Sequence, residues 1–299
     1  MKLEGVFAPL TTPFAKNGSV ALADLGANVE RYNATGLAGY VILGSTGEAV
    51  LLSQEESPRI LETARKAANA AKILIAGTGS ESTADTIVRT RQAADLGYAV
   101  AMVKPPHYFK PHLKAQVLLD HFRRIADASR IPILLYSIPQ FTGITLEAPD
   151  VAELAKHSNI IGIKESSGNV PRVAAIIAHT PKDFQVLVGS GSTFYASLMV
   201  GARGGILSLA CVLPELCVEL YVRERRGDAK GAQQLQQKLL PASRLIVEEG
   251  GPAGVKCAMD LRGYRGGAPR LPLAPLSERQ REEISDCLRA LEAGAATRA

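Results

Sequence analysis

The sequence contains no tryptophan, and aromatic residues make up only 5% of its 299 positions. This scarcity removes the stacking platforms on which binders of single-stranded nucleic acid depend. The formal net charge is +5, but the basic residues are scattered. Their one cluster, at residues 223–226, includes Glu224 in a helical stretch and favours a solvated helix face. We therefore expect no nucleic-acid partner.

Cysteine and histidine are also few. The four cysteines show no C-x-x-C spacing and the five histidines no H-E-x-x-H pair, so neither a zinc site nor a disulfide framework is indicated. No apolar stretch is long enough to span a bilayer, and the first residues lack the features of a secretory signal. We expect a soluble cytoplasmic protein with reduced thiols, no metal and no membrane partner.

Hydrophobic residues make up 46% of the chain, enough for a large core. Short apolar runs alternate with stretches of helical periodicity, which is typical of repeated βα units. Eight such runs are found, at Val6–Leu10, Tyr40–Leu43, Ile73–Ala76, Ala99–Val103, Ile133–Tyr136, Ile160–Lys164, Gln185–Val188 and Gly205–Leu209. No Gly-rich dinucleotide loop follows the first run, so a closed barrel is favoured over an open doubly wound sheet. We predict an α/β fold with a (β/α)₈ TIM barrel over residues 1–213 and a C-terminal helical segment over 214–299.

Two helix starts carry the capping-box pattern, at residues 53–56 and 277–280. The helical segment at the C-terminus is interrupted by a loop rich in glycine, proline and arginine, Gly263–Pro275.

Lys164 ends the sixth apolar run. A period of two places Gly162 and Lys164 on one face, toward the barrel interior. Burial lowers the pKa of a lysine from about 10.4, and a nucleophilic, imine-forming amine requires that shift. The alternative is a lysine that reaches solvent or pairs with Glu165.

Tyr136 ends the fifth run, and adjacent strands lie about 4.8 Å apart, so Tyr136 and Lys164 can face one ligand. A phenol beside such a lysine can relay protons, although a tyrosine at the core edge with its hydroxyl in water is the commoner arrangement. The loop at residues 44–48 offers backbone N–H groups and two hydroxyls for a small carboxylate. A simple tight turn is the alternative for this loop.

Three motifs, GSTGEA (44–49), YSIPQFTG (136–143) and GIKESSGN (162–169), resemble those of the dihydrodipicolinate synthase/N-acetylneuraminate lyase family. Its members are pyruvate-dependent class I aldolases. The likeness covers essentially the whole chain and is closest to the 4-hydroxy-2-oxoglutarate aldolase branch, through YSIP, DFQVLVGS (183–190) and GYRGG (263–267). The resemblance implies a lyase without a cofactor, assembled as a homotetramer from dimers.

The resemblance also implies roles for single residues. Lys164 would form the Schiff base, and Tyr136 would relay protons through Ser45 to Tyr108 of a neighbouring subunit. The remaining residues implied or suggested for substrate binding are Thr46 and Gly47 for the pyruvate carboxylate, Gly189 and Leu207 near the imine, and Ser166 for the aldehyde half. A helix or turn cap is the alternative role for Ser166.

Two departures bear on the substrate. The synthases of lysine biosynthesis carry an arginine where this chain has Phe141, and its loss removes a charge-assisted contact to a substrate carboxylate. The positions of the family's feedback-lysine site match poorly, at Ala49, Gln54, Ser57, Glu81 and His107. We therefore predict weak or absent inhibition by L-lysine.

The leading interpretation is cleavage of 4-hydroxy-2-oxoglutarate, or of a related 2-keto-3-deoxy acid, to pyruvate and an aldehyde. The alternatives are dihydrodipicolinate synthase, with Lys104 or Lys110 supplying the missing cation, and a non-catalytic pyruvate-binding barrel. The sequence does not decide the aldehyde partner.

Overall fold

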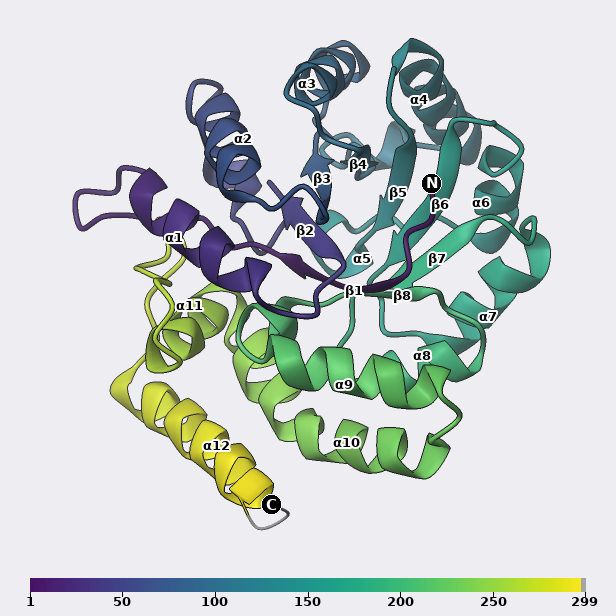
Figure 1. The fold of residues 1–299 in the computed structure, drawn as a ribbon. Helices are drawn as coiled ribbons and strands as arrows, with labels where there is room; N and C mark the ends of the chain where they lie inside the picture. The colour runs from purple at the N-terminus through teal and green to yellow at the C-terminus, as the bar shows by residue number, and fades with distance from the viewer. Residues whose placement is uncertain (297–299) are drawn as a thin grey trace.

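The computed structural model describes residues 1–296, with side chains described up to residue 292. Eight parallel strands form a closed barrel, in which each strand pairs with the next and β8 returns to β1. The helices surround these strands (Figure 1). The strands are β1 Gly5–Pro9, β2 Gly39–Ile42, β3 Ile73–Gly77, β4 Val100–Val103, β5 Ile133–Ser137, β6 Ile160–Glu165, β7 Gln185–Val188 and β8 Gly204–Ile206.

The helices follow the strands in the order expected of βα units. They are α1 Leu22–Asn33, α2 Glu56–Ala67, α3 Thr83–Asp95, α4 Ala115–Ala128, α5 Pro139–Thr142, α6 Ala148–Leu154, α7 Val170–His179, α8 Phe194–Met199, α9 Pro214–Arg225, α10 Ala229–Ala242, α11 Gly251–Leu261 and α12 Glu278–Ala296. Short 3₁₀ turns lie at Ala49–Leu51, Lys110–His112 and Ser208–Cys211, and a π-helical segment, Ser243–Glu249, joins α10 to α11.

The strands are apolar on both faces because both faces are buried. One hydrophobic cluster, which includes Phe7, Val41, Leu134 and Leu187, fills the barrel interior. A larger cluster lies between the outer face of the strands and the helices. This division fixes the orientation of every strand side chain, including those at the strand ends.

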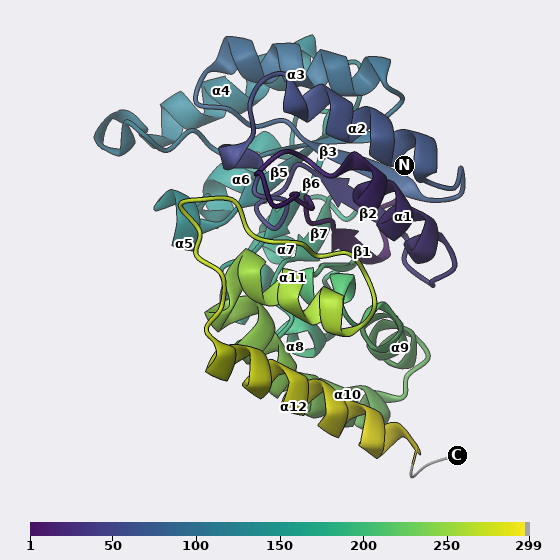
Figure 2. The same ribbon diagram turned by 90° about the vertical axis from the view of Figure 1, so that its left-hand side faces the viewer.

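The C-terminal helices are not all remote from the barrel. α9 packs against β1 and α10, and α12 packs against α10 and α11. Figure 2 shows α10 and α12 stacked beyond α11 at one end of the molecule. The division into a barrel of residues 1–213 and a segment from residue 214 stays a prediction.

The eight predicted strands are confirmed, with one correction. The run Gly205–Leu209 was predicted too long, because β8 ends at Ile206 and the chain turns into the 3₁₀ segment that begins at Ser208. Both capping boxes form. The Ser53 backbone N–H donates to Glu56 Oε2 at 2.9 Å, and the Ser277 backbone N–H donates to Gln280 Oε1 at 3.0 Å.

Across residues 1–296, no helix has the length and apolarity needed to cross a membrane. All four cysteines are free thiols, and two of them, Cys211 and Cys217, are buried.

Candidate active site

Lys164 and Tyr136 lie side by side at the carboxyl ends of β6 and β5, where they are paired in register. Lys164 is only 4% exposed, and its Nζ lies 4.3 Å from the centroid of the Tyr136 ring. The lysine therefore does not reach solvent. It does not pair with Glu165 either, because that carboxylate accepts from the backbone N–H of Ser167 at 3.1 Å.

Burial lowers the pKa of Lys164 from its ordinary value of 10.5 to about 7. Desolvation disfavours the ammonium form, and the ion pairs of the described residues include no carboxylate partner for Lys164. Among the described residues, Cys211 alone would oppose this shift, and it would do so only as a thiolate. A substantial fraction of Lys164 is therefore a neutral amine near neutral pH, which is the form that attacks a carbonyl carbon.

The Tyr136 phenol lies 3.2 Å from the hydroxyl oxygen of Ser45. Burial raises the pKa of Tyr136 to about 12, although its contacts with Ser45 and Ser166 oppose that rise. The phenol therefore keeps its proton at neutral pH. Tyr136 and Ser45 form a pair of hydroxyls through which a proton can move to or from a group bound at Lys164.

The loop after β2 is held by two further hydroxyl contacts. Thr46 Oγ1 lies 2.7 Å from Ser208 Oγ, and Thr12 Oγ1 donates to the carbonyl oxygen of Gly47 at 2.7 Å. Gly47 must be glycine, because a Cβ there would lie 2.8 Å from the carbonyl oxygen of Leu10. The loop is thus a fixed part of the site rather than a simple turn.

Gly189 and Ser166 lie beside the lysine. A Cβ on Gly189 would lie 3.2 Å from Lys164 Cε and would overlap Ser166 Oγ, so only glycine leaves room for both side chains. Ser166 is 7% exposed, and its hydroxyl lies near the Tyr136 phenol without a hydrogen bond of good geometry to any described residue. It caps nothing, because α7 is capped by Asn169, which accepts from the Arg172 backbone N–H at 2.9 Å. The hydroxyl thus lies near the Tyr136 phenol and lines the same cavity, where a bound ligand can reach it.

A cavity of about 610 Å³ lies over these residues. It is lined by six of the predicted site residues together with Phe141: Ser45, Thr46, Tyr136, Lys164, Ser166 and Gly189. Leu207 does not reach it. That residue is 1% exposed and belongs to the hydrophobic cluster outside the strands, because β8 turns outward there.

One wall of this cavity was not among the site residues predicted from the sequence. The wall comes from the π-helical segment and the start of α11, through Ser243, Val247, Glu248, Gly251, Pro252 and Val255. A π-helical segment inside a helical stretch is often found at functional sites. The Gly250-Gly251-Pro252 sequence, which interrupts an otherwise helical pattern, is the one signal that could have pointed to this wall. Ser208, which lines the cavity and contacts Thr46, was not predicted either, because it lay inside the run that was predicted as the eighth strand.

The Dihydrodipicolinate synthetase family matches this chain over residues 2–291. The chain belongs to that family. Members of this family are enzymes of the class I aldolase type and depend on pyruvate.

The named relatives are similar along almost their whole length. A 4-hydroxy-tetrahydrodipicolinate synthase of an Exiguobacterium species is 40% identical over 273 residues, which cover 91% of this chain and 92% of the relative. One of Methanothrix thermoacetophila is 38% identical and covers 95% of both chains. These names favour the synthase, which the sequence analysis held as an alternative, over the 4-hydroxy-2-oxoglutarate aldolase that it placed first.

Solved structures of the family have the same fold. The 4-hydroxy-tetrahydrodipicolinate synthase of Methylacidiphilum fumariolicum superposes with a TM-score of 0.94 at 31% identity, covering 99% of this chain and 98% of that one. The chloride-inhibited dihydrodipicolinate synthase of Acinetobacter baumannii, solved with pyruvate, gives 0.92 at 32% identity, covering 97% and 99%.

The position that carries an arginine in the family's synthases holds an exposed phenyl ring. Phe141 is 63% exposed at the rim of the cavity. Of the two lysines considered as replacements, Lys104 is engaged elsewhere, since its Nζ lies 3.4 Å from Glu81 Oε1. Lys110 lies beside the turn that follows Phe141, because a Cβ on Gly143 would be 3.1 Å from its Nζ.

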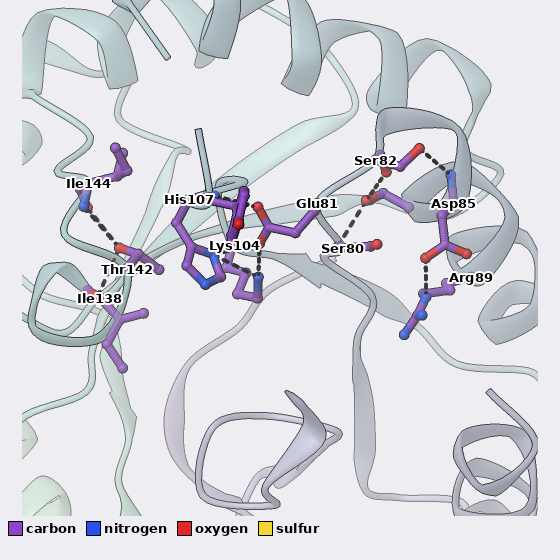
Figure 3. Close-up of polar contacts among 12 residues, drawn as sticks. Ser80, Glu81, Ser82, Asp85, Arg89, Lys104, His107, Ile138, Thr142 and Ile144 are labelled. Carbon is purple, nitrogen blue, oxygen red and sulfur yellow. Dashed lines mark hydrogen bonds and ion pairs between the residues drawn. The ribbon is translucent and has the colours of Figure 1, made fainter. Parts of the chain in front are cut away.

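Four of the five positions compared with the family's feedback-lysine site, Ala49, Ser57, Glu81 and His107, line a second cavity of about 360 Å³, which shares Ser45 and Tyr136 with the first; Gln54 does not line it. Figure 3 shows Glu81 pointing toward Lys104 and His107, and Glu81 Oε1 lies 2.7 Å from His107 Nδ1. The Glu81 carboxylate also accepts from the backbone N–H groups of His107 and Tyr108. Burial opposes ionisation, but these N–H groups and Lys104 lower the pKa of Glu81. Glu81 is thus already saturated by groups of its own chain.

Tyr108 stands apart from the other predicted catalytic residues. Its side chain is 77% exposed and packs edge-on against Phe109, with ring centroids 5.0 Å apart. The Glu81 contacts fix the backbone that carries it. Its role in a neighbouring subunit stays a prediction.

Proposed function

We propose that the protein condenses pyruvate with aspartate semialdehyde, as a 4-hydroxy-tetrahydrodipicolinate synthase, through an imine at Lys164. The observation that carries this proposal is the buried lysine itself, with a pKa near 7 and a tyrosine phenol against its side chain. The names of the relatives support the choice of the second substrate.

In the first step, the neutral Lys164 amine attacks the keto carbon of pyruvate, and water leaves as the imine forms. The protonated imine accepts electrons, so the methyl carbon of pyruvate loses a proton and becomes a nucleophilic enamine. The hydroxyls of Tyr136 and Ser45 carry the protons of these steps. Thr46, held by Ser208, is in position to bind the carboxylate of pyruvate.

In the second step, the enamine carbon attacks the aldehyde, whose oxygen takes a proton. The amino group of the semialdehyde then attacks the imine carbon and displaces Lys164, which closes the ring. Ser166, which lines the cavity, offers a hydroxyl to this half of the substrate, and Lys110, beside Gly143 in the turn that follows Phe141, is the candidate cation for the second carboxylate.

One observation favours a second function, cleavage of 4-hydroxy-2-oxoglutarate to pyruvate and glyoxylate. Phe141 offers no charge to the carboxylate of aspartate semialdehyde, which lies two carbons further from the aldehyde than the carboxylate of glyoxylate, and the described lining of the cavity contains no cation except Lys164. An arginine contact of that kind contributes about 1.5 to 3 kcal/mol, so its loss lowers kcat/KM for the synthase reaction by tenfold or more, roughly.

Two measurements test these functions. Borohydride added with pyruvate should modify Lys164 irreversibly, as intact mass and peptide mapping would show. An unmodified Lys164 together with an active Lys164→Ala variant would exclude the mechanism. The ratio of kcat/KM for condensation with aspartate semialdehyde to that for cleavage of 4-hydroxy-2-oxoglutarate then decides between the two reactions.

We further propose that the active form is a homo-oligomer in which Tyr108 completes the hydroxyl relay of a neighbouring subunit. The Tyr108 side chain is 77% exposed in the single chain, so it is accessible to the site of a neighbouring subunit. Sedimentation of the wild type and of Tyr108→Phe tests this. A fully active monomer would rule it out.

A further inference from the structure

A second buried lysine lies on the other side of the substrate loop. The Lys256 and Glu48 side chains are both fully buried, and Lys256 Nζ lies 2.5 Å from Glu48 Oε1. Glu48 directly follows Ser45, Thr46 and Gly47 in the loop after β2, whereas Lys256 is on α11. The ion pair therefore joins the substrate loop to the C-terminal helical segment.

Further contacts fix both partners. Lys256 Nζ donates to the carbonyl oxygen of Ala268 at 2.9 Å, and the backbone N–H of Arg270 donates to Glu48 Oε2 at 2.7 Å. The Arg270 guanidinium in turn donates to both carboxylate oxygens of Glu56 at 2.7 Å. The ring of Phe14 lies beneath both cations, 4.3 Å from Lys256 Nζ and 4.1 Å from the Arg270 guanidinium. The loop between α11 and α12 is thereby fastened over Glu48.

The backbone at Glu48 needs such support. Its φ is +55°, in the left-handed region that a residue with a side chain adopts only at a cost in free energy. Such a conformation persists where surrounding contacts determine it. Here the determining contacts are those of the Glu48 carboxylate, which the backbone turn directs inward to Lys256 and Arg270.

The same helix also forms part of the active-site wall. Val255, next to Lys256, lines the cavity that holds Lys164, together with Pro252. A movement of α11 would therefore displace both the cavity wall and the anchor of the substrate loop.

We propose that Glu48 and Lys256 are a positioning pair, which holds Thr46 against Ser208 in the geometry that binds the carboxylate of pyruvate. The proposal rests on the function proposed above for Lys164. Lys256 takes no part in the chemistry, and acts on pyruvate only through Glu48 and the loop that precedes it.

Two variants test the pair. Glu48→Gln keeps an oxygen of the same reach but removes the negative charge. The double variant Glu48→Gln/Lys256→Met removes both charges, so neither is left buried without its partner. As a matched control, Arg123→Met breaks the half-exposed ion pair between Arg123 and Glu153, 2.6 Å long, with the same change of cation to methionine.

For the double variant we expect a melting temperature close to that of the control. We expect KM for pyruvate to rise about tenfold or more, with kcat changed less than about threefold. The pH dependence of borohydride trapping should stay that of the wild type, because Lys164 is untouched. If the double variant does not fold, KM of Glu48→Gln is judged by the same criterion.

A double variant with the wild-type KM, or an equal rise of KM in Arg123→Met, would overturn the proposal, since the pair would then serve the fold alone. Failure of the underlying function looks different. In that case the wild type itself would form no borohydride adduct with pyruvate.

Discussion

Lys164 and Lys256 are two lysines buried to nearly the same degree in one protein, and they differ in what surrounds the ammonium group. Lys256 lies 2.5 Å from the Glu48 carboxylate and donates to a backbone carbonyl as well. Lys164 has an aromatic ring and a thiol nearby, and no carboxylate of residues 1–292 forms an ion pair with it. Burial lowers the pKa of both lysines, but at Lys256 the Glu48 carboxylate opposes that effect.

The comparison shows that burial alone does not make a nucleophile. A buried lysine with a carboxylate partner stays charged and serves to hold two segments together. A buried lysine without one gives up its proton near neutral pH and becomes reactive. The two lysines lie on opposite sides of one loop, in which residues 45 and 46 face Lys164 and residue 48 faces Lys256. Residues only a few positions apart therefore contribute to two different environments.

The largest expected effect is on catalysis. Lys164→Ala should lower kcat by about a thousandfold or more and abolish the pyruvate adduct, since no other group can form the imine. Lys256→Met should still form the adduct at saturating pyruvate, because its nucleophile is intact. Trapping followed by peptide mapping measures both. A pyruvate adduct on Lys256 would contradict the conclusion that only Lys164 of these two lysines is reactive.

The next effect is on stability, and it should have opposite signs at the two sites. Lys256→Met leaves the Glu48 carboxylate buried without a partner and should lower the free energy of unfolding by about 3 to 5 kcal/mol. Lys164→Met removes an amine whose charged form is disfavoured by burial. This variant should be more stable than the wild type at pH 7, by an amount on the order of a few kcal/mol.

The stability that Lys164→Met gains over the wild type should depend on pH, and the direction follows from the pKa of Lys164. The pKa of Lys164 is about 7 in the folded chain and near 10.5 when exposed, so between these values the unfolded chain binds more protons. Wild-type stability should then rise with pH across this window. The advantage of Lys164→Met should be full below pH 7 and vanish as the pH approaches 10.5. Denaturant titrations at several pH values measure it, and a gain independent of pH would contradict the assignment.

These two lysines also show what a sequence can and cannot predict. Lys164 could be found because a local period of two orients it and because Tyr136 ends the neighbouring run, so both clues are short-range. Lys256 could not, because nothing near it in sequence announces a buried partner. The role of Lys256 depends on a long-range contact, in which α11 packs onto a loop from the N-terminal part of the chain. The cavity wall from the π-helical segment and the outward turn at Leu207 also depend on long-range contacts, so neither could be predicted from the sequence.

A third change should make Lys164 resemble Lys256. Ser166→Asp places a carboxylate beside Gly189, where Ser166 and Lys164 already face each other. An opposite charge within about 4 to 6 Å raises the pKa of a lysine, so the midpoint of pyruvate trapping should move upward by about one pH unit or more. Ser166→Asn, uncharged and of the same shape, is the matched control. Equal midpoints in the two variants would show that burial alone governs Lys164.

The smallest effect is expected at Cys211, the one group that opposes the lowered pKa of Lys164. A thiol can stabilise the ammonium form only as a thiolate. Burial raises the pKa of Cys211 far above neutrality, and its sulfur donates to the carbonyl oxygen of Pro9 at 3.1 Å, so it is a neutral donor at pH 7. Cys211→Ser keeps a neutral donor of similar size and should shift the trapping midpoint by less than about 0.3 pH units, with rates within about twofold. The midpoint is read from trapping rates measured between pH 6 and 9, beside Ser166→Asp on the same scale. A downward shift of a full unit in Cys211→Ser would mean that a thiolate faces Lys164 in the wild type. Lys164 would then have a counter-ion of its own, as Lys256 has, and its reactivity would need another cause.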